Sequence, residues 1–293
     1  DALPICISDR AAHQYIDFLV WCVFSNHRLC ERQVFIMIEV VHVSVTYEQK
    51  EVLHDISLTI PKGRIVMMLG ENGSGKTTLM KAMLDKLPFV QGDILWKQES
   101  LRKLNEKQRA ACFSYVPQIK EMVADIKVMD CIVAGCTRRL SLFEVPDAKE
   151  YAKANAVLKK FQLAHIKDKY LHEISGGELQ MTYVARAFLQ DSEVILMDEP
   201  CTYLDFQHQH LFLQQAKQLA QQGTSLFISI HDPNLALQYA DDIYILHEGR
   251  IYTHLKKEEP FLRRRCCECY NTIYGKHFAL ARDDSSGYLV WKE

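Results

Sequence analysis

The stretch of sequence that decides the fold is Gly70-Glu71-Asn72-Gly73-Ser74-Gly75-Lys76-Thr77, which satisfies the pattern G-x-x-x-x-G-K-S/T in full. It follows a continuous apolar run, Ile65 to Leu69, that is typical of a buried strand, and it opens a helical stretch, Lys76 to Leu84. In this setting the backbone N–H groups of the glycine-rich turn can surround phosphate oxygens, and the helix N-terminus adds positive potential. We therefore predict a phosphate-binding loop, or P-loop, in which Lys76 reaches the β and γ phosphates of a nucleotide and Thr77 ligates magnesium.

A second apolar strand ends in two carboxylates, in the stretch Val194-Ile195-Leu196-Met197-Asp198-Glu199. This is the form expected of a Walker B strand beside a P-loop. We predict that Asp198 holds magnesium, directly or through water, and that Glu199 orients and polarises the attacking water. Taken alone, a strand that ends in Asp-Glu is a common connection to a loop. The P-loop upstream is what favours the catalytic interpretation.

A third motif, Ile174-Ser175-Gly176-Gly177-Glu178, precedes the helical stretch 176–189, and Ser175 lies 23 positions before Asp198. A serine with two small residues before a helix exposes backbone N–H groups, which predicts a second phosphate clamp. The stretch resembles the signature sequence of ABC ATPases, usually written LSGGQ or LSGGE, with Ile174 in place of leucine. Alone, Ser-Gly-Gly is an ordinary start of a helix, and its position relative to Asp198 disfavours that interpretation.

The resemblance to ABC ATPases covers residues 37 to about 255 and adds four positions one by one. It implies that Tyr47 stacks on adenine and that Gln118 contacts magnesium and signals to the permease. It also implies that Asp205 belongs to the loop that shapes the dimer interface and that His231 contacts the γ-phosphate. Each of these residues alone is more often structural, so their order and spacing carry the interpretation.

The resemblance implies an α/β fold, namely a P-loop NTPase core of the ABC type with an antiparallel β subdomain and a helical insert. It implies ATP and Mg²⁺ as ligands and an ATPase activity. The expected catalytic residues are Glu199, His231 and Gln118, and the expected metal ligands are Thr77, Gln118 and Asp198. The expected nucleotide-binding residues are Tyr47, Gly70, Glu71, Asn72, Gly73, Ser74, Gly75, Lys76, Thr77, Thr78, Ser175, Gly176, Gly177, Glu178 and Asp205. Two residues, Leu179 and Cys201, depart from the family pattern, but neither is at a position expected to contact phosphate.

The remaining segments fit this organisation. Two alternating runs, 38–46 and 52–60, predict half-exposed antiparallel strands, and the alternation of strands and helices after residue 176 predicts parallel strands. Between the antiparallel strands and these parallel strands, the helical spacing of apolar residues predicts an all-helical insert. We assign residues 1–36 to an N-terminal extension of unknown role, 37–255 to the ATPase domain, about 125–175 to its helical insert and 256–293 to a C-terminal tail. Met37 is a candidate for the natural start.

Composition restricts the class of protein. The chain has 293 residues, is 48% hydrophobic and carries a formal net charge of −2, which gives no basic field that would attract nucleic acid. Its 10 cysteines are scattered through apolar segments, which favours a reducing cytosol. The apolar run 16–24 contains Asp17, is far shorter than the roughly 20 residues of a spanning helix and lacks a leader's features. We expect a peripheral protein on the cytoplasmic face of the cell membrane.

The motif Cys266-Cys267-Glu268-Cys269, with His277 nearby, invites a metal interpretation. Zinc needs about four ligands, and no second close pair of cysteines follows. We therefore expect buried thiols on a helix of the tail.

Within the family, three stretches resemble the branch that serves iron-siderophore, haem and cobalamin importers, namely 134–143, 203–209 and 231–236. This resemblance implies integral-membrane permease subunits and, indirectly, an external substrate-binding protein as partners. It also implies a head-to-tail homodimer in which Ser175 to Glu178 of one subunit covers the ATP of the other. We expect the permease to dock near Gln118 and the surface around 128–143. Nothing in the sequence identifies the transported substrate.

Other functions remain to be weighed. The nearest alternatives are zinc, manganese or molybdate importers. DNA-repair and chromosomal ABC ATPases separate P-loop and signature by long coiled coils, whereas only 99 positions separate Lys76 from Ser175 here. Translation factors of this type carry two cassettes, and this chain has one. An inactive regulatory cassette would have lost Lys76, Glu199 or His231, and all three are present.

Overall fold

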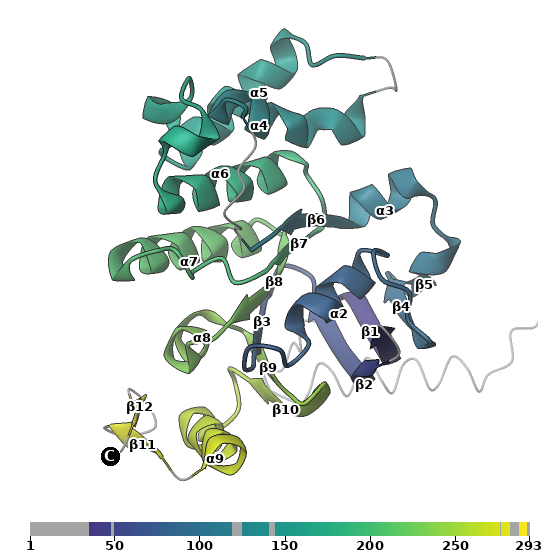
Figure 1. Cartoon of the computed structure of the whole chain (residues 1–293), viewed down its shortest axis with the longest axis vertical. Coiled ribbons are helices and arrows are strands. Elements are labelled where there is room, and N and C mark those ends of the chain that lie inside the picture. The colour runs from purple at the N-terminus through teal and green to yellow at the C-terminus, as the bar shows by residue number, and fades with distance from the viewer. Residues whose placement is uncertain are drawn as a thin grey trace, which may run out of the picture. The chain divides into compact units, whose positions relative to one another are not determined.

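Two sheets organise the part of the chain that the computed structural model describes, which comprises residues 35–47, 50–118, 125–140, 144–275, 277–281 and 287–291, without the side chains of residues 138 and 139 (Figure 1). All of these residues belong to one compact unit that begins at Phe35. The larger sheet has the order β10 (Arg250–Lys256), β9 (Asp242–His247), β3 (Ile65–Leu69), β8 (Ser225–Ile230), β7 (Val194–Met197) and β6 (Phe113–Val116). The smaller sheet has the order β2 (Lys50–Pro61), β1 (Ile36–Tyr47), β4 (Gln91–Trp96) and β5 (Glu99–Ser100).

Strand β3 lies inside the larger sheet and is buried along its whole length. It pairs in parallel with β8 on one side and with β9 on the other. Because side chains alternate along a strand, Ile65, Met67 and Leu69 join one hydrophobic cluster, whereas Val66 and Met68 join a second. A strand covered on both faces is expected to be apolar at every position, which explains why this run could be recognised from the sequence.

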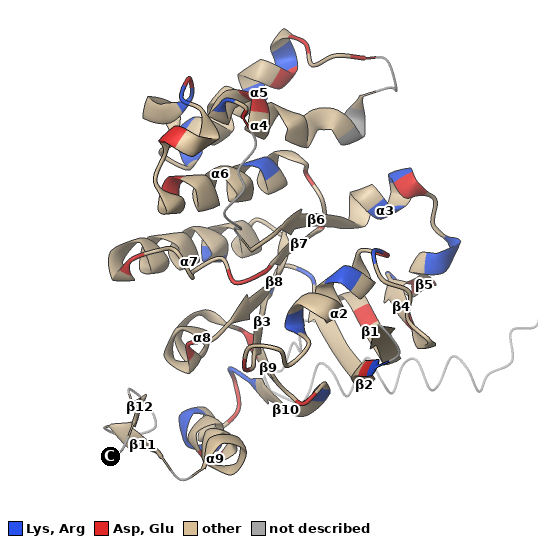
Figure 2. Ribbon diagram, in the orientation of Figure 1, with Lys and Arg blue, Asp and Glu red and all other residues tan. Residues whose placement is uncertain are grey.

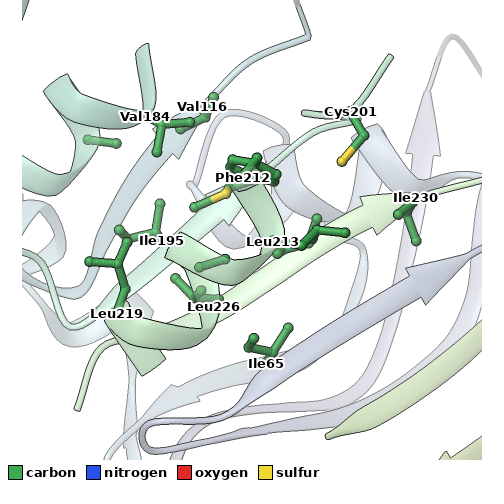
Figure 3. Close-up of a cluster of buried hydrophobic side chains, with 14 of the residues drawn as sticks. Ile65, Val116, Val184, Ile195, Cys201, Phe212, Leu213, Leu219, Leu226 and Ile230 are labelled. Atoms are coloured by element: carbon green, nitrogen blue, oxygen red, sulfur yellow. The ribbon is translucent and has the colours of Figure 1, made fainter. Parts of the chain in front are cut away.

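Helices cover both faces of the larger sheet. The first cluster contains residues of α6 (Gly176–Leu189) and α7 (Phe206–Gln221), including Val184, Phe212 and Leu213, packed against Ile195 and Leu226 of the strands (Figure 3). The second cluster joins α2 (Lys76–Met83) to the antiparallel sheet. Figure 2 shows β3, β7 and β8 without charged residues, whereas both signs of charge mix on the outer helices. The fold is that of an ABC ATPase cassette, α/β with an antiparallel β subdomain, as predicted.

A group of short helices follows β6. It contains α4 (Val128–Val133), α5 (Ala148–Lys160) and the 3₁₀ turns η2 (Ala134–Arg139), η3 (Ala164–Ile166) and η4 (Leu171–Glu173). Backbone hydrogen bonds from Val128 N to Lys169 O (2.9 Å) and from Leu171 N to Ile126 O (3.0 Å) close this insert at its base. The remaining connections before it are η1 (Leu101–Lys103) and α3 (Glu106–Cys112).

The chain beyond β10 continues as regular structure. It forms α9 (Leu262–Tyr274) and an antiparallel hairpin of β11 (Phe278–Ala281) and β12 (Tyr288–Trp291), and a short helix, α8 (Pro233–Tyr239), lies earlier in the chain, between β8 and β9. On α9, Cys266, Cys267 and Tyr270 are buried and belong to the first hydrophobic cluster, together with Leu289 of β12. The thiols of the Cys266 to Cys269 motif thus lie on a helix, as expected, and two of them are buried.

Most predicted elements are found, with small shifts. The predicted helical insert begins with a segment that is α over 128–133 and 3₁₀ over 134–139, and the helical stretch 176–189 is found with those bounds. Within the described ranges, no helix is both long and apolar enough to cross a bilayer. The apolar run 16–24, Leu142 and Phe143 lie outside the described residues.

Candidate nucleotide-binding and hydrolysis site

The P-loop connects β3 to α2, and two of its glycines adopt backbone conformations that L side chains rarely take. Gly73 has φ +81° and Gly75 has φ +111°, both in the left-handed region. A Cβ atom at Gly75 would also lie 2.5 Å from Leu53 Cδ2, and one at Gly70 would lie 2.6 Å from Leu246 O. The loop therefore needs glycine for its backbone shape and for its close contact with the flanking strands.

Lys76 begins α2 and is 4% exposed. Its ammonium donates hydrogen bonds to Gly70 O (2.8 Å) and Glu71 O (2.9 Å), and it lies 3.7 Å from Glu199 Oε1. Burial lowers the pKa of Lys76 from its ordinary value, and the negative charges of Glu199 and Asp198 oppose this effect. The loop thus holds a cation at the end where the outer phosphates are expected, with bonds that phosphate oxygens can replace.

Asp198 lies directly after β7, and both of its oxygens have partners. Thr77 Oγ1 donates to Oδ2 (2.7 Å), and Ser229 Oγ donates to Oδ1 (2.8 Å). Strand β7 is separated from β3 by β8 alone, so the ends of neighbouring parallel strands bring these three side chains together. A carboxylate and a hydroxyl in contact are oxygen donors of the kind that Mg²⁺ prefers. Thr77 and Asp198 therefore fit a magnesium ion.

Glu199 is the centre of the site. Gln118 Nε2 donates to its Oε2 (2.8 Å), and His231 Nε2 lies 2.6 Å from its Oε1. Its backbone N–H donates to Ser229 Oγ (2.8 Å), and its φ of +49° is a left-handed conformation that is strained for glutamate. The carboxylate is thereby held at the end of the P-loop by three segments far apart in the sequence.

The two nitrogens of His231 have different partners. Nδ1 lies 3.2 Å from the carbonyl oxygen of Gly70, and Nε2 faces the Glu199 carboxylate. Because a carbonyl oxygen only accepts, Nδ1 is the donor in the contact with Gly70. The imidazole is thus held between the P-loop backbone and the Glu199 carboxylate, beside the expected position of the γ-phosphate.

Two residues of this site were not predicted from the sequence. Ser229, the second-last residue of β8, bridges Asp198 and Glu199, and Tyr115 OH lies 3.4 Å from Asp198 Oδ2. Burial raises the pKa of Tyr115, and the charge of Asp198 adds to the effect. The sequence signal for Ser229 was a polar residue in the otherwise apolar run 226–230, two positions before His231.

The signature residues form a second group. Ser175 caps α6 by accepting from Glu178 N (3.3 Å), while the Glu178 carboxylate accepts from Ser175 N (2.9 Å) and lies 3.1 Å from His165 Nε2. Burial raises the pKa of Glu178, but the hydrogen bonds from Ser175 and His165 outweigh it and leave the pKa below its ordinary value. Ser175, Gly176, Gly177, Glu178 and Asp205 line one cavity of about 640 Å³.

The predicted residues therefore form two clusters. The first joins Gly70, Lys76, Thr77, Gln118, Asp198, Glu199 and His231 through the contacts above. The second joins the signature residues to Asp205, which caps α7 by accepting from His208 N (2.8 Å). Glu71 shares a different cavity with Gly70 and His231. Of the other predicted residues, Tyr47 is half exposed at the end of β1, Asn72 is exposed in the P-loop, Ser74 is buried there, and Thr78 lies in the first turn of α2.

The site combines a buried parallel strand, a P-loop that opens a helix, a carboxylate that can bind magnesium, and a glutamate fixed by its neighbours. Together these features define a P-loop nucleotide hydrolase. Comparisons with known proteins give the family. The family profile described as ABC transporter matches residues 53–202. The "Probable iron chelatin transport ATP-binding protein" of Helicobacter pylori is 33% identical over 218 residues, which are 74% of this chain and 86% of that protein.

Two further comparisons agree. A manganese transport system ATP-binding protein of Listeria monocytogenes is 29% identical over 229 residues, 78% of this chain and 93% of that protein. A solved structure described as a metal-chelate type ABC transporter in an inward-facing conformation aligns with a TM-score of 0.73 and 23% identity, over 88% of this chain and 96% of that chain. The chain belongs to the ABC transporter family and is one of its ATP-binding proteins, with the ATPase activity of that family.

Proposed function

We propose that this chain is the ATP-hydrolysing subunit of an ABC importer for an iron-siderophore or a related metal chelate. The observation that carries the hydrolytic part is the arrangement around Glu199, whose carboxylate contacts Gln118, His231 and Lys76 at the mouth of the P-loop. A carboxylate in this position can orient a water molecule and accept its proton.

Each residue of the first cluster has a distinct task in this proposal. The P-loop N–H groups and Lys76 bind the phosphates, and Thr77 and Asp198 hold magnesium, with Gln118 as a further ligand. Magnesium, when bound, neutralises phosphate charge. Glu199 orients the water, and His231 fixes the γ-phosphate. Tyr47, exposed at the end of β1, is available to stack on adenine.

The division of the site into two clusters supports a head-to-tail homodimer. The signature residues line a cavity different from the one beside the P-loop, so one subunit does not present both clusters to one nucleotide. In the proposed dimer, Ser175 to Glu178 of one copy cover the nucleotide held by the other. Asp205 lies beside the signature residues and contributes to the same contact.

The proposed permease contact lies between the insert and the core. A cavity of about 410 Å³ is lined there by Tyr115, Ala134, Gly135, Arg186 and Gln190, among others. Tyr115 also contacts Asp198. A permease helix bound in this cavity would therefore be separated from the proposed catalytic carboxylates by one side chain, that of Tyr115. This contact would bring the chain to the cytoplasmic face of the membrane, where an external substrate-binding protein is an indirect partner.

The names of the relatives favour the substrate class but include an alternative. The Helicobacter relative is named for iron chelatin and the solved structure for a metal chelate, whereas the Listeria relative is named for manganese. Uptake of radioactive iron-siderophore and of manganese, measured in cells that lack the gene and cells that carry it, separates the two. Loss of siderophore uptake alone supports the proposal, and loss of manganese uptake alone supports the alternative. A gene copy with Lys76→Ala should restore neither.

A further inference from the structure

The C-terminal hairpin is attached to the rest of the chain by two asparagine side chains with the same geometry. Asn271 of α9 donates from Nδ2 to Phe278 O (2.9 Å) and accepts at Oδ1 from Phe278 N (2.8 Å). Asn234 of α8 donates from Nδ2 to Leu289 O (3.2 Å) and accepts at Oδ1 from Leu289 N (2.8 Å). A carboxamide that both donates to and accepts from one residue's backbone imitates a neighbouring strand. Each strand of the hairpin therefore has one such attachment.

The Asn234 attachment lies on the segment that carries His231. Strand β8 ends at Ile230, His231 follows, and α8 begins at Pro233. Asp232 caps this helix by accepting from Asn234 N at 2.7 Å, and proline restricts the backbone at the first helical position. A displacement of Leu289 is thus passed to His231 through three residues with little conformational freedom.

Packing holds the attachment point in place. Leu289 is 6% exposed and belongs to the same buried cluster as Leu235 of α8 and Tyr270 of α9. Phe278 and Trp291, which are paired across the hairpin, contact each other with ring centroids 5.1 Å apart. The two strands of the hairpin are therefore packed against α9, and β12 is also packed against α8.

The hairpin also faces the catalytic histidine. A cavity of about 570 Å³ has Gly70, Glu71 and His231 on its wall, and its other lining residues are Tyr270, Ile273, Tyr274, Phe278 and Trp291. The side of the site on which His231 lies is thus bounded by aromatic residues of the C-terminal segment.

We infer that Asn234 is a positioning residue for ATP hydrolysis, which links the C-terminal hairpin to His231 and sets the imidazole against Glu199. The inference depends on the proposed role of His231. It goes beyond that role because it assigns a task in hydrolysis to β11 and β12. A merely structural attachment would change the stability of the chain and leave its turnover unchanged.

The test uses the full chain with Asn234→Ala and Asn234→Asp, and Asn271→Ala as the matched control. Asn234→Ala removes both hydrogen bonds, and Asn234→Asp keeps the side-chain volume while it places a carboxylate oxygen against Leu289 O. Both should lower kcat for MgATP about tenfold, with KM changed less than about twofold. Asn271→Ala loosens the same hairpin at its other strand and should lower the melting temperature by a similar amount while kcat is retained. Should Asn234→Ala fail to fold, Asn234→Asp carries the comparison.

A second measurement uses the fluorescence of Trp291, which lines the same cavity as His231. Its emission, taken as the difference between the parent and Trp291→Phe, should change when ATP is added, and Asn234→Asp should abolish this change. Equal loss of kcat in the Asn234 and Asn271 variants, or full kcat in both Asn234 variants, overturns the inference. The proposed function is tested separately by His231→Ala. Full turnover in that variant overturns the role of His231, whereas an inactive His231→Ala beside fully active Asn234 variants overturns this inference alone.

Discussion

Glu199 concentrates the chemistry of the site because one carboxylate faces an amide, an imidazole and an ammonium. Its side chain is 11% exposed, so these contacts lie in an environment that water screens poorly. Its left-handed backbone conformation is maintained by Ser229 and by the strand before it. Changes at this residue should therefore affect the chemical step more than the binding of nucleotide.

Glu199→Gln should keep ATP binding and slow hydrolysis by about 10²–10⁴-fold, the usual contribution of a general base. The amide retains the volume but cannot accept a proton from water. Single-turnover hydrolysis and equilibrium binding of ATP measure the two effects, and gel filtration with ATP should detect a trapped dimer. Glu193→Gln, just before the start of the same strand, is the control, because Glu193 bonds Trp96 and Lys97 instead. Normal turnover of Glu199→Gln in the presence of the permease would contradict its assignment.

Ser229→Ala should raise the magnesium concentration needed for half-maximal activity and lower kcat by about tenfold, or about 1.4 kcal/mol of transition-state stabilisation. The variant removes a hydrogen bond to buried Asp198 and the acceptor of Glu199 N. Ser192→Ala is a matched control, since the buried Ser192 hydroxyl donates to Ser114 on the neighbouring strand and away from the site. An unchanged magnesium dependence in Ser229→Ala would show that Asp198 needs no such support.

At the scale of elements, some residues of the helical insert belong to the hydrophobic core and others lie at the surface. The apolar residues of α4, including Val128, Ile132 and Val133, are buried in the first hydrophobic cluster and are unavailable to a partner. Ala134, at the start of η2, is exposed and lines the cavity between insert and core. Val128, Ile132 and Val133 are therefore excluded from the docking surface expected around 128–143, whereas Asp130, Ala134 and Thr137 are exposed, and the part at 141–143 stays a prediction.

Ala134→Arg should weaken co-purification with the permease at least about tenfold, because charge and bulk in a buried interface are costly. ATP hydrolysis by the isolated subunit should stay within about twofold of the parent, since Ala134 contacts none of the proposed catalytic residues. Ala156→Arg, an exposed alanine of α5, supplies the same change outside the cavity. Undiminished permease binding by Ala134→Arg would move the interface elsewhere.

At the scale of the whole molecule, residues 1–36 are predicted to be dispensable for nucleotide binding. Phe35 O accepts from Lys62 N (2.8 Å), and Ile36 pairs with Pro61, so the described unit begins just before Met37. Deleting residues 1–34 should leave ATP affinity and melting temperature unchanged. Deleting residues 1–36 should keep ATP affinity and cost about 1 kcal/mol of stability through one lost hydrogen bond. A folded deletion that no longer binds ATP would assign the extension to the ATPase.

What could be predicted from the sequence follows the physics of each segment. β3 and β7 are apolar along their length, and β8 is apolar except at Ser225 and Ser229, because both faces of these strands are covered. The P-loop has a fixed glycine pattern, so these elements and the site residues of the P-loop and of the end of β7 could be predicted. The hairpin of β11 and β12 is held by asparagine side chains from two other elements, and no local pattern reveals such long-range contacts. The role of Ser229 likewise depends on a pairing between strands that are far apart in the chain.

The buried cysteines have a practical consequence. Cys112, Cys131, Cys136, Cys201, Cys266 and Cys267 are buried, and burial raises the pKa of Cys201 to about 12. Only a thiolate attacks an alkylating reagent, so each of these positions reacts when its surroundings open, about tenfold more slowly for every 1.4 kcal/mol of opening free energy. Cys201 follows the catalytic strand and Cys266 lies under the C-terminal hairpin. Mass spectrometry of alkylation over time would therefore time the opening of the nucleotide site and of the hairpin in the same unmodified chain.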